Sequence, residues 1–187
     1  MKANRSRCNQ SLDAREFQGI AQKAFNTIVQ KYLDNGTLVL GDKECKKLID
    51  GNLGYAEYKL NNPNTIKEEF REKYGRHEFL LAHSRVSNEH FMGSDFITEG
   101  QGKYAIQVND RREIGKGSME RWRDTESKIL EHLITIFDSQ YTDNEGWIKL
   151  YTDREPCLSC DNHIIEFTRL FPRIELTIYY EYPYNIV

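Results

Sequence analysis

The chain has 187 residues, and its content of 39% hydrophobic and 12% aromatic residues is typical of a globular domain rather than a disordered segment. Its 26 basic and 29 acidic residues give a net charge of −3, which argues against wide, sequence-independent wrapping of duplex nucleic acid but allows a local basic channel. No apolar run reaches the length of a membrane span and no signal-peptide core follows Met1, so we expect no membrane segment.

The first 76 residues predict helices and contain no catalytic motif. Helical patterns cover residues 11–33, 42–49 and 65–74. Gly51 and Gly54 are interpreted as the end of the second pattern, because glycine commonly terminates a helix. We therefore expect residues 1–76 to form a helical extension or cap, and residues 77–187 to form the domain that carries the chemistry.

Two strands are predicted next, over residues 78–86 and 103–108. His83 and Ser84 stand near the end of the first strand, and we interpret them as lining a substrate pocket. Strand and loop packing is the alternative, since a lone histidine is more often structural than functional.

A basic segment follows the second predicted strand and leads into the next helix. Its cationic residues are Arg111, Arg112, Lys116, Arg121 and Arg123. Contact between these residues and substrate phosphates is one interpretation, with Arg121 and Arg123 as the candidates at the substrate site. A solvated charged loop is the other.

The next predicted helix covers residues 126–137, where apolar residues fall on one face. Asp124 precedes this helix and is a favoured N-cap residue, so the side chains of Asp124 and Glu126 should both lie at the helix start. Helix capping and dipole complementarity would explain both acids without any catalytic role.

A short strand around Ile148 and Leu150 leads into the motif Pro156-Cys157-x-x-Cys160 and then into a helix that ends before Pro172. Two cysteines three residues apart on a first helical turn direct their sulfurs at one point, and the helix dipole there favours thiolate. A final strand is predicted from residue 174. A Cys-x-x-Cys pair alone would also suit a thiol-redox protein or a structural zinc site.

Together, Asp124-x-Glu126 and Pro156-Cys157-x-x-Cys160 resemble the zinc-dependent nucleobase (cytidine) deaminase superfamily, whose signature is H-x-E followed by P-C-x-x-C. The segments DTESKIL, G-x-I-x-L-x-T, PCxSC and F-x-R-L-F-P-R-I look most like deaminase domains of bacterial polymorphic toxins. Asp124 departs from the signature, since it stands where the superfamily has His or Cys. The resemblance covers roughly residues 78–182. It implies an α/β, cytidine-deaminase-like three-layer fold, with a mixed sheet of four to five strands flanked by helices.

The resemblance also implies a Zn²⁺ ion held by Asp124, Cys157 and Cys160, with Glu126 as proton shuttle and Pro156 at the substrate site. An aspartate and two thiolates would leave the zinc group at a charge of −1, as three thiolates do elsewhere in the superfamily. His163, three residues after Cys160, is the alternative third ligand.

The implied function is hydrolytic deamination, cytosine to uracil in DNA or RNA, single-stranded or duplex. The implied setting is a secreted bacterial toxin domain that acts in the cytoplasm of a target cell and is countered by an immunity protein. A deaminase of free nucleosides or nucleotides is the alternative within enzymes. Outside this chemistry, the alternatives are a thiol-redox protein and a zinc-stabilised binding module without turnover.

Overall fold

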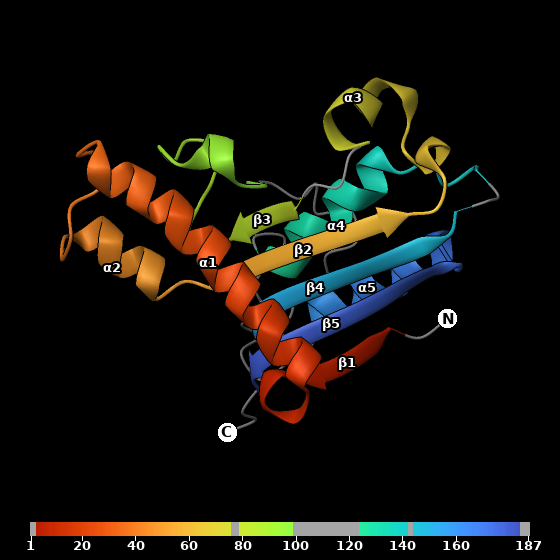
Figure 1. The fold of residues 1–187 in the computed structure, drawn as a ribbon, viewed down its shortest axis with the longest axis horizontal. Coiled ribbons are helices and arrows are strands. Elements are labelled where there is room, and N and C mark those ends of the chain that lie inside the picture. Colours follow the sequence, from red (N-terminus) through yellow and green to blue (C-terminus); the bar gives the residue numbers. More distant parts are fainter. Residues whose placement is uncertain (1–2, 76–78, 99–123, 142–143, 184–187) are drawn as a thin grey trace, which may run out of the picture.

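The computed structural model describes residues 3–75, 79–98, 124–141 and 144–183 (Figure 1). Its strands form one mixed sheet in the order β1-β5-β4-β2-β3. Their bounds are β1 (Asn4–Arg7), β2 (Leu53–Leu60), β3 (Phe79–His83), β4 (Gly146–Arg154) and β5 (Ile174–Tyr182). Strands β1, β5 and β4 run parallel, whereas β2 is antiparallel to both β4 and β3.

Helices cover both faces of the sheet, which gives three layers (Figure 1). Their bounds are α1 (Leu12–Asp34), α2 (Lys43–Ile49), α3 (Arg71–Tyr74), α4 (Thr125–Ile136) and α5 (Leu158–Leu170). Helix α1 crosses one face, and α4 and α5 lie side by side behind the other. The predicted three-layer α/β fold with a mixed sheet is confirmed. In the described part of the chain, no helix combines the length and apolar character needed to cross a membrane.

The strand alternation divides the core into two clusters, one on each face of the sheet. Ile148 and Leu150 of β4 belong to the cluster under α4 and α5, whereas Tyr151 belongs to the cluster under α1. On the α1 side, the ring of Phe17 contacts those of Tyr55 and Tyr179, with centroids 5.3 and 5.5 Å apart. By the same alternation, the side chain at position 152 points toward α4 and α5.

The connection from β4 through α5 to β5 joins two parallel neighbours. Helix α5 therefore starts just beyond the carboxyl end of β4. Helix α4 also starts at the carboxyl end of β4, because Glu126 in its first turn contacts Thr152 near the end of that strand. Open α/β sheets commonly bind their ligands beyond the carboxyl ends of their strands.

Two strands lie in the segment for which we predicted helices alone. Strand β2 occupies the middle of the sheet, and its residues 53–56 are buried on both faces, so it lacks the alternation of a half-buried strand. Strand β1 has no hydrophobic residue and is held at the edge by its parallel pairing with β5. In residues 65–74, only α3 is α-helical, after the 3₁₀ turn Glu68–Phe70. The predicted strand over residues 103–108 lies outside the described residues.

Candidate metal centre and active site

Asp124, Cys157 and Cys160 converge at the starts of α4 and α5. The carboxylate oxygen Oδ2 of Asp124 lies 3.4 Å from Sγ of Cys157 and 3.5 Å from Sγ of Cys160. The two sulfurs are 3.4 Å apart, and both cysteines are free thiols. These three donors form a group that could hold a metal ion, and both cysteines are buried.

The donor set fits zinc. A tetrahedral Zn²⁺ with ordinary bond lengths separates two thiolate sulfurs by about 3.8 Å and a sulfur from a carboxylate oxygen by about 3.6 Å. The observed sides, 3.4 Å between the sulfurs and 3.4 and 3.5 Å from the sulfurs to the oxygen, are shorter than these by about 0.1–0.4 Å, so small side-chain shifts would admit the ion. Three protein ligands of this kind leave a fourth position for substrate or water, which is typical of catalytic rather than structural zinc sites.

The Asp124 side chain does not cap its helix. The residue has the extended backbone of an N-cap, with φ −64° and ψ 144°, but its side chain accepts no hydrogen bond from the first turn of α4. The carboxylate instead faces the two sulfurs. The capping explanation that the sequence left open therefore does not account for where this side chain lies.

His163, the alternative third ligand, has both ring nitrogens engaged elsewhere. Its Nε2 lies 2.9 Å from Oε1 of Glu131, and its Nδ1 lies 3.0 Å from the backbone carbonyl of Ser159. Glu131 belongs to α4, so this fully buried contact joins the two helices that carry the donor group. The contact between His163 and Glu131 therefore supports the packing of α4 against α5.

The pKa of the Cys160 thiol depends on the groups around it and on whether a metal ion is bound. The hydrogen bond with Cys157, together with burial and the nearby Glu126 carboxyl, raises the pKa of the Cys160 thiol well above its usual value. A redox cysteine needs the opposite, a lowered pKa and an exposed sulfur. A bound dication would reverse the shift, because it favours thiolate directly.

Glu126 is buried in the first turn of α4, with 2% of its surface exposed. Burial, and then the nearby Asp124 carboxylate, raise the pKa of Glu126 to about 7. The hydroxyl of Thr125 donates to its Oε2 and that of Thr152 to its Oε1, both at 3.1 Å, and these bonds act in the opposite direction on the pKa. A carboxyl group with this pKa can both accept and donate a proton near neutral pH.

A close approach between β2 and α4 makes this arrangement possible. A Cβ atom at Gly54 would lie 2.6 Å from Cβ of Thr125, which is closer than real side chains come. Gly54 is therefore not the end of a helix, as we predicted, but a strand residue that lets the start of α4 reach the sheet.

The structure places His83 and Ser84 at the end of β3 in different roles. His83 is buried, with Nε2 3.0 Å from the Leu48 carbonyl and Nδ1 accepting from the Arg85 N–H at 3.2 Å. Burial lowers the pKa of His83 to about 4, so the ring is neutral, as these contacts require. Ser84 lies nearer the site, because its hydroxyl accepts a hydrogen bond from the backbone N–H of Asn52.

Of the remaining predicted site residues, Pro156 is buried directly before Cys157. Arg121 and Arg123 lie outside the described residues, as does the rest of the basic segment. Sequence reasoning missed Asn52, whose Nδ2 donates to the hydroxyls of both Thr125 and Thr152. Its only signal in the sequence was its position between two glycines.

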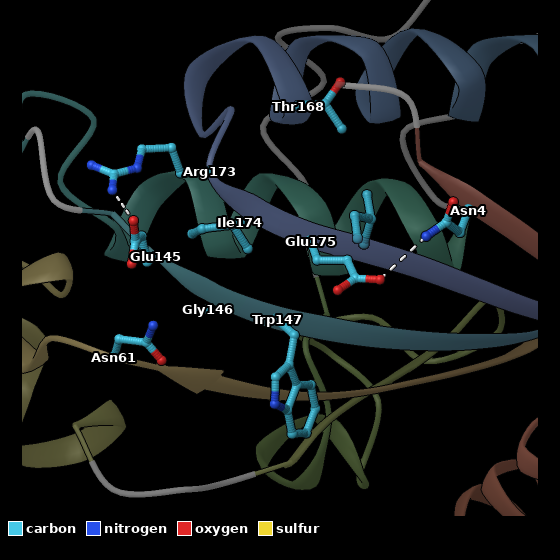
Figure 2. Close-up of a pocket in the computed structure, with 10 residues that line it drawn as sticks. Asn4, Asn61, Glu145, Gly146, Trp147, Thr168, Arg173, Ile174 and Glu175 are labelled. Carbon is cyan, nitrogen blue, oxygen red and sulfur yellow. Dashed lines mark hydrogen bonds and ion pairs between the residues drawn. The ribbon is translucent and has the colours of Figure 1, made fainter.

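A separate cavity of about 480 Å³ lies at the opposite ends of β4 and β5 (Figure 2). Its lining includes Asn61, Glu145, Trp147, Thr168, Arg173 and Glu175. Arg173 forms an ion pair with Glu145, and Asn4 donates to Glu175 at 3.3 Å, so charged groups of the lining are paired with one another (Figure 2). This cavity is remote from the donor group.

The fold and the donor group at two adjacent helix starts define an α/β domain of the cytidine deaminase-like superfamily. The family model of Toxin-deaminase, described as the BURPS668_1122 family of deaminases, matches residues 39–182. The chain belongs to this family of toxin deaminases, which confirms the resemblance seen in the sequence. Neither a curated protein nor a solved structure matches the chain.

Proposed function

We propose that this domain is a zinc-dependent hydrolase that converts cytosine to uracil within DNA or RNA. The observation that carries the proposal is the convergence of Asp124, Cys157 and Cys160 beside the buried carboxyl of Glu126, in a chain that belongs to a deaminase family. Asp124, Cys157 and Cys160 would hold the ion. When bound, zinc supplies Lewis-acid activation of the water molecule that attacks the ring.

The chain's own residues account for the proton transfers. Hydrolytic deamination consumes cytosine and water and releases uracil and ammonia, so protons must move from water to the ring nitrogen and to the departing amine. Glu126 can perform each transfer, since its pKa of about 7 leaves both protonation states accessible. Thr125 and Thr152 hold its two oxygens in place. Burial of the carboxyl excludes bulk water from the reaction.

The biological setting in the proposal follows from the family. A toxin deaminase acts on a target that the producing cell must protect, so we include secretion, action in the target-cell cytoplasm and an immunity protein in the proposal. The preference for polynucleotide over free nucleoside is supported by the basic residues of segment 109–123, which can contact phosphates.

An oligonucleotide panel tests the substrate. We expect uracil to form in cytosine-containing single-stranded oligonucleotides, detected by sequencing, and expect none from free cytidine. Matched DNA, RNA and duplex members of the panel define the substrate further. Turnover of free cytidine alone would favour the nucleoside deaminase, and bound zinc without turnover on any member would favour the binding module.

The Glu126→Gln variant tests the acid–base assignment. It should keep its zinc and fold but lose about 10²–10⁴-fold in turnover, because a positioned acid–base group is removed. Glu44→Gln is the matched control, since Glu44 occupies the same position in the first turn of α2 and is partly exposed. Normal turnover in Glu126→Gln would contradict the proposed mechanism.

A further inference from the structure

A chain of hydrogen bonds links Asn52, which precedes β2, to the carboxyl of Glu126. Nδ2 of Asn52 donates to Oγ1 of Thr125 at 3.0 Å and to Oγ1 of Thr152 at 3.1 Å. Each hydroxyl then donates to a different oxygen of Glu126. Both carboxylate oxygens are therefore connected to one amide through two threonines, one on α4 and one on β4.

The direction of these bonds is fixed by chemistry. Oδ1 of Asn52 accepts from the backbone N–H of Arg154 at 3.2 Å. Because that N–H can only donate, the amide oxygen must face it and the NH₂ group must face the threonines. A hydroxyl has a single hydrogen, so a threonine that accepts from Asn52 can give its own hydrogen to Glu126. The hydroxyl of Thr152 has two acceptors within reach, and Oε1 of Glu126 at 3.1 Å is nearer than Oδ1 of Asn52 at 3.5 Å.

The backbone of Asn52 is itself held at the site. Its N–H donates to the hydroxyl of Ser84 at 2.8 Å, and its carbonyl accepts from the Ser84 N–H at 3.0 Å. Ser84 directly follows β3, and Arg154 ends β4. The ends of two strands therefore fix the amide that faces the start of α4.

We propose that Asn52 is a positioning residue for the deamination, which orients the hydroxyls of Thr125 and Thr152 so that both donate to Glu126. The inference rests on the proposed function, because it assumes that Glu126 transfers the protons. It assigns a role to a residue outside both sequence motifs. Since Asn52 acts through Glu126 and not on the donor group, its loss should lower the rate and leave zinc and substrate binding in place.

The Asn52→Asp variant tests this role directly. It preserves the size of the side chain and the acceptor for the Arg154 N–H, but it replaces the NH₂ donor with an oxygen acceptor. The hydroxyl hydrogens of Thr125 and Thr152 would then turn toward this oxygen and away from Glu126. On a cytosine-containing single-stranded oligonucleotide, we expect kcat to fall about 10–100-fold, as when the hydrogen-bond partner of a site residue is lost. KM should change by no more than about two-fold, and zinc content should be unchanged.

The matched control is Asn62→Asp. Nδ2 of Asn62 also donates to a hydroxyl, that of Tyr141 at 2.6 Å, but at the opposite end of β2. We expect this variant to keep its kcat. Unchanged kcat in Asn52→Asp, or an equal loss in both variants, would overturn the inference.

A double-mutant cycle tests the route. In a Thr125→Val, Thr152→Val background, the connecting hydroxyls are absent, so adding Asn52→Asp should cause no further loss of kcat. Losses that multiply would show that Asn52 acts by another route and would overturn the inference. If Asn52→Asp folds poorly or sheds zinc, Thr152→Val alone serves. It must lower kcat at unchanged KM, and an unchanged kcat would again overturn the inference.

Glu126→Gln, measured alongside, separates the two proposals. An inactive Glu126→Gln together with a fully active Asn52→Asp would overturn the role of Asn52 alone. A fully active Glu126→Gln, or a wild-type chain that forms no uracil on any oligonucleotide, would overturn the proposed function and this inference with it.

Discussion

Helices α2 and α4 begin with the same pattern, an aspartate followed two residues later by a glutamate, yet the two helix starts differ in structure. In α2, Oδ1 of Asp42 accepts from the backbone N–H of Cys45 at 2.6 Å, as an N-cap does. In α4, Asp124 makes no capping bond and faces the sulfurs of Cys157 and Cys160. An aspartate at a helix start is thus a cap or a ligand candidate according to what lies opposite it.

The two glutamates differ in the same way. The side chain of Glu44 is 41% exposed and pairs with Lys47 one turn along the helix. Glu126 is buried between Thr125 and Thr152. The spacing in the sequence is identical, so the chemistry of the second pattern comes from β2, β4 and α5, which surround it.

Replacing each aspartate by serine should have the largest effect. Serine can cap a helix but cannot replace a carboxylate ligand. We expect Asp124→Ser to lose zinc and to lose turnover by more than about 100-fold. Removing a residue that only hydrogen-bonds to a metal ligand costs up to about 100-fold, and removal of the ligand itself should cost more. Asp42→Ser should keep both. Zinc content and turnover, measured side by side, give the answer.

Full zinc and normal turnover in Asp124→Ser would remove the difference between the two helix starts. Asp124 would then be a cap in solution, and the third ligand would have to come from elsewhere. His163 would be the first residue to replace, even though its nitrogens face Glu131 and Ser159 in the structure.

The region from β4 to β5 was predicted well because each element has a clear local signal. Ile148 and Leu150 alternate with polar residues, the cysteine motif opens α5, and Pro172 follows its end. Helix α1 was predicted for the same reason, and Ser11 caps it by accepting from the Ala14 N–H. Such signals depend on neighbours in sequence.

Strand β2 and the surroundings of Glu126 could not be predicted in this way. Strand β2 is buried on both faces and contains Gly54, so its pattern suggested the end of a helix rather than a central strand. Thr125 and Thr152 lie within the segments that resemble toxin deaminases, but those patterns assign them no role, and Asn52 lies outside every pattern. Their roles depend on contacts that only the folded sheet creates.

The contact between Glu131 of α4 and His163 of α5 should show the next largest effect. Without a side-chain cap, α4 depends on bonds such as that between Glu131 and His163, which are 4% and 0% exposed. We expect Glu131→Leu to lower the free energy of unfolding by about 1–3 kcal/mol, because the buried Nε2 of His163 loses its contact with Glu131. Urea unfolding of zinc-loaded protein measures this loss.

The exposed pair on α2 provides the control for that measurement. Glu44 and Lys47 lie at the surface, so Glu44→Gln should change the free energy of unfolding by less than about 1 kcal/mol. Replacing Glu131 and His163 together by leucine should recover part of the loss, since neither partner is then left unpaired. Equal effects at Glu131 and Glu44 would contradict the distinction between the buried and the exposed helix.

Acid should destabilise α4 through His132. Burial, and then the nearby Lys73, lower the pKa of His132 to about 4, and its Nε2 has no hydrogen-bond partner among the described residues. In the unfolded chain the pKa returns to about 6.5, so between these values the unfolded state binds more protons. The stability due to neutral His132 is therefore full above about pH 6.5 and falls as the pH drops toward 4.

His132→Phe isolates this contribution, because phenylalanine preserves the edge-to-face contact with Tyr74, whose ring centroid lies 5.0 Å away. Wild type should lose more stability than the variant between pH 7 and pH 5. Both proteins share every other titrating group, so the difference between their curves reports His132. Parallel curves would show that His132 ionises freely in the folded protein.

The smallest effect is expected where the aspartate only caps. Asp42→Ala removes the acceptor for the Cys45 N–H and should lower the free energy of unfolding by about 1 kcal/mol, whereas Asp42→Asn should restore most of it, since asparagine caps equally well. Zinc content and turnover should match wild type in both variants, because α2 contributes no member of the donor group. Denaturant unfolding with a parallel zinc assay makes the measurement. If Asp42→Ala lost zinc or turnover, α2 would be coupled to the site. The aspartate of α2 could then no longer be regarded as a helix cap alone, in contrast to the aspartate of α4 as a metal ligand.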